Sequence, residues 1–136
     1  AIINALGWDY YGKSNADAFL NYIAKVRNTS ADKVVFADLT GTELMCYGYA
    51  KAMDDYSNVS EALQILELAK EKMPDSYTVN LIHAVISGQY EFDANWCGIW
   101  QVTQKVLNNK SLRRDMKTAA IQSVVDYMIL YKSYCA

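Results

Sequence analysis

The segment SEALQILELAKEKMPDS, residues 60–76, decides the fold class. It runs for more than three helical turns without a breaker and ends at Pro74, a residue that an α-helix does not accommodate in its interior. Ala62, Leu66 and Ala69 recur at four- and three-residue spacing, so they share one helical face. Two alanines on the face that should fill a core predict a close approach by a neighbouring helix, because only small side chains permit it.

Length and composition indicate one helical domain. A chain of 136 residues is long enough for a single hydrophobic core. One proline and six glycines are too few for the many turns of an all-β fold, whereas long segments without breakers favour helices. We therefore expect residues 1–136 to form one all-α domain of about six helices. The chain starts at Ala1 without an initiator methionine or a signal peptide, which indicates a piece of a longer or processed protein.

Charge and hydropathy argue against two classes of partner. The net charge is −2, so no basic field attracts nucleic acid. No apolar run reaches the ~18 residues that a membrane span needs, and we expect no span. We expect a soluble protein, and the sequence does not decide between the cytoplasm and export after removal of a leader.

Capping signals mark where the central helices begin. Thr40 precedes Glu43 by three residues, which is the spacing of a capping box. Asn58 precedes Glu61 at the same spacing, and Ser76 can cap a third helix. The predicted turns between these helices are only four to six residues long, so neighbouring helices should lie antiparallel.

Three further helix boundaries come from periodicity and turn residues. Apolar residues at three- and four-residue steps predict an amphipathic helix over residues 15–27. Gly88 is a natural exit for the third helix, since glycine tolerates the left-handed conformation that ends helices. Asp93 can open a fourth helix that continues through Leu107, and a last helix is predicted over residues 111–133.

Residues 43–76 resemble a tetratricopeptide repeat, a unit of two antiparallel helices that is 34 residues long. A degenerate second unit over 77–110 keeps Ala84 at the position of Ala50. The resemblance implies a right-handed stack of antiparallel helix pairs, an α-α superhelix. The matching positions of the first unit are Ala50, Ala62, Leu66, Ala69 and Pro74.

The resemblance also implies where a partner would bind. Members of this family bind extended peptides on the concave face formed by the first helix of each unit. Members that bind a C-terminal carboxylate use a cluster of Lys, Asn and Arg there, and only Lys51 fits that pattern. The residues that we expect to contact a peptide or protein partner are Tyr47, Lys51, Asp54, Leu81 and Val85.

Trp96 and Trp100 form an aromatic stripe. They lie four residues apart and therefore share a helical face. Such a stripe belongs to the core in most helices. The alternative is an aromatic pocket for a small molecule, and the sequence leaves both interpretations open.

Cysteine and histidine usage argues against an enzyme. Cys46, Cys97 and Cys135 are an odd number without a CxxC pair, so we expect free or buried thiols rather than a disulfide or a zinc site. His83 could meet Cys97 across a helical hairpin and activate a thiolate, but no third orienting group is evident. We therefore expect no catalytic residue, no metal and no cofactor.

The predicted C-terminal helix carries apolar residues on more than one face, which indicates that something covers it. One face carries Ala120, Val124 and Met128, and another carries Ile121, Val125 and Ile129. We therefore expect a non-catalytic protein–protein interaction module that binds a peptide or a neighbouring domain. The alternative is an accessory domain of a larger enzyme, in which this helix docks on a catalytic domain; a homodimer would use the same face.

Overall fold

The computed structural model describes residues 2–6 and 13–136, and the described residues form helices without any β-strand. This confirms the predicted all-α fold. The α-helices are α1 (Ile2–Leu6), α2 (Asn15–Val26), α3 (Gly41–Asp54), α4 (Ser60–Lys72), α5 (Tyr77–Tyr90), α6 (Trp96–Asn108) and α7 (Thr118–Met128). Short 3-10 helices are η1 (Ala31–Lys33), η2 (Phe36–Asp38) and η3 (Ile129–Tyr134).

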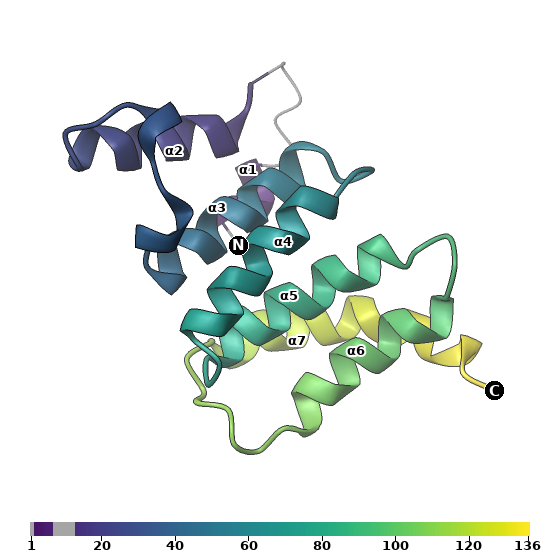
Figure 1. The fold of residues 1–136 in the computed structure, drawn as a ribbon. Helices are drawn as coiled ribbons and strands as arrows, with labels where there is room; N and C mark the ends of the chain where they lie inside the picture. Colours follow the sequence, from purple (N-terminus) through teal and green to yellow (C-terminus); the bar gives the residue numbers. More distant parts are fainter. Residues whose placement is uncertain (1, 7–12) are drawn as a thin grey trace.

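Consecutive helices pack against each other from α3 to α6 (Figure 1). The connections between them are four or five residues long, which places each helix antiparallel to the one before it. Helix α2 packs on α3 at one side of this array, and α7 with η3 packs on α6 at the other. The chain is therefore a row of neighbouring helix pairs, with additional helices at both sides.

Two of the predicted caps open their helices as expected. The Thr40 side chain accepts a hydrogen bond from the Glu43 backbone N–H, and the Glu43 carboxylate accepts one from the Thr40 N–H, which completes the capping box of α3. The Ser76 side chain accepts from the Val79 N–H at the start of α5. Both satisfy backbone donors that have no partner inside the helix.

Two other predicted starts are wrong by one or two residues. Asn58 does not cap α4, whose N-cap is Val59 without any side-chain hydrogen bond. Asp93 lies in the turn before α6, where the Asn95 side chain accepts from the Gly98 N–H instead. Side-chain spacing alone did not distinguish between neighbouring polar residues that could each serve as a cap.

Gly88 does not end α5, which continues to Tyr90. A Cβ atom at Gly88 would lie 3.1 Å from Ile99 Cγ2 and 3.2 Å from Met128 Cε. The glycine therefore permits close packing of α5 against α6 and α7 rather than a left-handed turn.

The predicted helix over 111–133 is also wrong in extent. Residues 109–117 form a loop, and α7 is only Thr118–Met128. The loop is held at the start of α5, because the Asp115 carboxylate accepts from the Thr78 N–H at 2.9 Å and from the Ser76 hydroxyl at 2.7 Å. These contacts occupy residues that would otherwise extend the helix.

The alanine pattern that predicted a close crossing is buried as expected. Ala62 is 1% exposed and Ala69 is 0% exposed. The crossing of α3 and α4 is also tight at Gly48, where a Cβ atom would lie 2.9 Å from Leu66 Cγ and 3.2 Å from the Ala62 carbonyl oxygen. A small residue on each helix therefore permits this approach.

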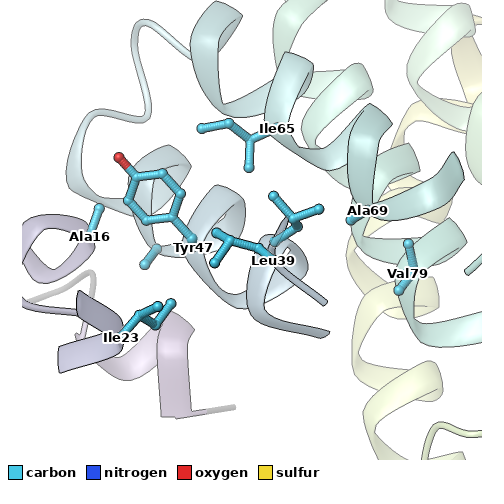
Figure 2. Close-up of a cluster of buried hydrophobic side chains, with 9 residues drawn as sticks. Ala16, Ile23, Leu39, Tyr47, Ile65, Ala69 and Val79 are labelled. Atoms are coloured by element: carbon cyan, nitrogen blue, oxygen red, sulfur yellow. The ribbon is translucent and has the colours of Figure 1, made fainter. Parts of the chain in front are cut away.

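The core consists of four hydrophobic clusters that follow one another along the chain. The first joins α2, the η2 region, α3, α4 and the start of α5 (Figure 2). The second lies between α3, α4 and α5, and the third joins α5 to the 109–117 loop and α7. The fourth contains Ile99, Trp100 and Met128, between α6 and the C-terminal segment.

Candidate partner-binding surface

Two of the five residues predicted to contact a partner are core residues. Tyr47 is 4% exposed and lies among the buried side chains of the first cluster (Figure 2). Its ring packs edge-to-face on Phe36 with the ring centroids 5.4 Å apart. Leu81 is 0% exposed and packs with Tyr77 and Leu112. The prediction of an open face at these positions is wrong, because α2 and η2 cover this side of α3 and the 109–117 loop covers α5.

The polar members of the predicted set have partners within the chain. Lys51 Nζ lies 3.1 Å from Glu61 Oε2. The Asp54 carboxylate accepts hydrogen bonds from the backbone N–H groups of Asn15 at 3.1 Å and Ala16 at 2.8 Å, at the start of α2. Asp54 therefore supplements, from another helix, the Ser14 side chain that caps α2. Val85 is half-buried beside the second and fourth clusters, so the structure does not bring the five residues together on one open face.

The two tryptophans of the aromatic stripe have different environments. Trp100 is 7% exposed and belongs to the fourth cluster. Trp96 is 40% exposed. Two pockets of about 310 and 280 Å³ lie on the described surface, and neither tryptophan lines either of them. The alternative of a small-molecule pocket at the two tryptophans gains no support from these two pockets and stays a prediction.

Trp96 instead belongs to an exposed group of rings, which we call the aromatic cluster: Phe92, Trp96, Tyr127, Tyr131 and Tyr134. Trp96 stacks on Phe92 with ring centroids 5.6 Å apart and meets Tyr134 edge-on at 4.6 Å. Tyr131 contacts both Trp96 and Tyr127, at 6.3 and 5.8 Å. The rings come from the α5–α6 turn, α6, α7 and η3, which are brought together only by the fold.

Burial raises the pKa of two phenols in and near the aromatic cluster. Burial, followed by the hydrogen bond with Tyr127 at 3.2 Å and the neighbouring phenols, raises the pKa of Tyr131 to about 12. Burial, followed by the phenols of Tyr127, Tyr49 and Tyr131, raises the pKa of Tyr56 to about 12 as well. Tyr56 lies in the α3–α4 turn, and its pKa responds to phenols of α7 and η3.

A disulfide lies next to the aromatic cluster. Cys97 and Cys135 are bonded with their Cα atoms 4.8 Å apart, and Cys46 is free. The expectation of three free thiols is therefore wrong. The two cysteines are 38 residues apart and match no spacing pattern, so only their proximity in the fold reveals the bond. Because Trp96 and Tyr134 directly precede the two cysteines, the bond holds their rings near each other.

The structure does not pair His83 with a thiolate. The Cys97 sulfur is in the disulfide, and His83 Nε2 contacts Glu67 Oε1 instead. Burial lowers the pKa of His83, and the opposing effect of Glu67 does not restore it. Among residues 2–6 and 13–136, no group of three His, Cys, Asp or Glu side chains is placed to hold a metal ion.

Comparison with known proteins adds no identification. No family model matches the chain, and no curated protein or solved structure matches it either. The packing of neighbouring helix pairs is compatible with a helical repeat. A search of the described helices also finds none with the length and apolar character needed to cross a bilayer.

Proposed function

We propose that the protein is a non-catalytic interaction module that binds a peptide or a neighbouring domain through the aromatic cluster. The observation that carries the proposal is the exposure of clustered rings: Trp96 is 40% exposed, Tyr127 46% and Tyr134 54%. Tryptophan and tyrosine are enriched among the residues that dominate protein interfaces, because they bury much area for little loss of side-chain entropy. Rings already packed on one another lose less still.

The resemblance of the helix packing to tetratricopeptide repeats supports the proposal. In that family the first helices of successive units line the concave face, and here α3, α5 and α7 would take that position in a right-handed stack. Tyr56, in the turn after α3, is near enough to Tyr127 and Tyr131 for their phenols to affect its pKa. Recognition would therefore depend on aromatic rings and phenol hydroxyls rather than on a cluster of cationic side chains that binds a C-terminal carboxylate.

The alternative function as an accessory domain of a larger enzyme uses the same surface. Ile129 is 44% exposed and Leu130 64% exposed, directly after α7. Adjacent apolar side chains of this kind occur where a second domain or a second copy of the chain docks. Sedimentation equilibrium of the isolated protein would separate self-association from binding to a different chain.

The test compares capture of partners by two single variants. Trp96→Ala removes the ring that contacts Phe92, Tyr131 and Tyr134. Tyr22→Ala is the matched control, because Tyr22 is an aromatic residue of α2 that is 63% exposed and lies outside the cluster. Immobilised wild type and both variants are incubated with extract of the source cells, and bound proteins are quantified by mass spectrometry.

We expect wild type and Tyr22→Ala to retain the same partner and Trp96→Ala to lose at least about tenfold in retention, which is typical of an interface hot spot. Circular dichroism establishes that each variant is folded. Equal retention by all three proteins would contradict a binding role for the aromatic cluster.

A further inference from the structure

A second surface feature lies away from the aromatic cluster. It is a pocket of about 280 Å³ between α4, α5 and α6, which we call the lysine pocket. Its lining includes Lys70 of α4, His83 of α5 and Lys105 of α6, so each of the three helices contributes one basic side chain. None of its lining residues belongs to the aromatic cluster, so it does not depend on the proposed function.

The two lysines of the lysine pocket have no ion-pair partner. Neither Lys70 nor Lys105 forms an ion pair within the part of the chain that the structure describes. The nearby carboxylate of Glu67 keeps its negative charge but contacts His83 Nε2 rather than either ammonium group. Two unpaired ammonium groups beside one pocket attract a ligand that carries more than one negative charge.

The distribution of basic residues along the chain also favours binding of an anion at the lysine pocket. No lysine or arginine occurs over residues 73–104. Because α4 and α6 run in the same direction, their C-terminal ends lie at one end of the helix array. The basic residues at that end are Lys70, Lys72, Lys105, Lys110, Arg113, Arg114 and Lys117. Arg113 is paired with Asp75 and Asp115, and the other six form no ion pair within the described residues. These six positive charges raise the local concentration of anions near the lysine pocket.

The lysine pocket has polar groups at its rim and an apolar floor. Asn109 Oδ1 accepts from the Ser111 hydroxyl and N–H, which leaves its amide NH₂ as a donor. The Ser87 hydroxyl lies 3.5 Å from His83 Nδ1. Ala84 and Leu112 are 3% and 8% exposed and supply a buried apolar floor. An apolar floor with a few polar groups at its rim is the usual layout of a small-molecule site.

We propose that the lysine pocket binds the phosphoryl group of a small phosphomonoester. A phosphate dianion matches two ammonium groups and accepts a hydrogen bond from the amide NH₂ of Asn109. The apolar floor would contact the organic part of the ligand. Free inorganic phosphate presents the same phosphoryl chemistry without that organic part, so the two sources are distinguished by comparing them.

The experiment is an NMR titration of the whole chain. His83 is the only histidine, so its ring protons give a single reporter inside the pocket. The probes are phenyl phosphate, inorganic phosphate and, as a singly charged control, benzoate. The test variant is Lys70→Ala combined with Lys105→Ala. The matched control is Lys25→Ala combined with Lys33→Ala, which removes two exposed lysines from the α2–η1 region.

We expect a saturable shift of the His83 signals with phenyl phosphate in wild type and in the control variant. The affinity should fall at least about tenfold in the test variant, since removal of each ammonium group weakens the binding of a phosphate dianion severalfold. Weaker binding of inorganic phosphate would support the contribution of the apolar floor. A shift that does not saturate, that is equal in all three proteins, or that benzoate reproduces at the same concentration would overturn the proposal.

Discussion

Removing the Cys97–Cys135 disulfide should destabilise the protein substantially. The bond closes a loop between residues 38 apart. The chain-entropy relation for a loop of this length gives about 4 kcal/mol at room temperature, because the cross-link restricts the unfolded chain. For a domain of this size, with a denaturant dependence of about 2 kcal/mol per molar urea, the unfolding midpoint should fall by about 2 M urea.

The assay is urea unfolding of the oxidised protein and of the Cys97→Ser, Cys135→Ser double variant. Cys46→Ser is the matched control, because it removes the free thiol and leaves the bond. Titration of thiols in the urea-unfolded, unreduced wild type should find one reactive group. Three reactive thiols, or equal midpoints for all three proteins, would refute the bond and with it the covalent attachment of η3 to α6.

Three further predictions concern packing, capping and pH. Gly48→Ala should lower the melting temperature, because the clash with buried Leu66 outweighs the gain of about 1 kcal/mol that alanine normally brings to a helix; a higher melting temperature would argue against the close crossing. Asp54→Ala should cost about 1–2 kcal/mol of unfolding free energy in a urea melt, since two backbone N–H groups at the start of α2 lose their acceptor while the Ser14 cap remains, and Asp55→Ala, which removes no contact with α2, should cost less. Burial alone would raise the pKa of Asp115, but hydrogen bonds from the start of α5 and the adjacent guanidinium lower it below the usual 3.8. The unfolded chain therefore binds this proton first on acidification, so the stabilisation is present above about pH 4 and is lost as pH falls through the folded pKa. Asp115→Asn should flatten this acid dependence in urea melts between about pH 5 and about pH 2, and an unchanged slope would contradict the assignment.

The central helices could be predicted because their signals are local. The Thr40–Glu43 box and the Ser76 cap each involve residues three apart, and the buried alanines lie on one helical face. Such features depend only on helix geometry, which the sequence displays directly.

The candidate surface could not be predicted, because it depends on contacts between distant segments. The sequence predicts a partner contact for Asp54, yet its carboxylate accepts hydrogen bonds from the start of a helix about 40 residues earlier in the chain. Tyr47 had the spacing of a groove residue, but the weakly periodic segment before it folds over its ring. Cys97 and Cys135 carry no shared motif. Burial and bonding at these positions are set by tertiary packing, which single-sequence periodicity does not contain.

The order of the four hydrophobic clusters bears on how the molecule would yield to mechanical force. Each cluster shares helices mainly with the next one, as in a row of nearest-neighbour units, so tension on the two ends would peel the outer helices before the middle ones. The cross-link shields the stretch between residues 97 and 135 from extension. Rupture would therefore begin at the α2 side, and the aromatic rings beside the cross-link would be among the last parts to separate.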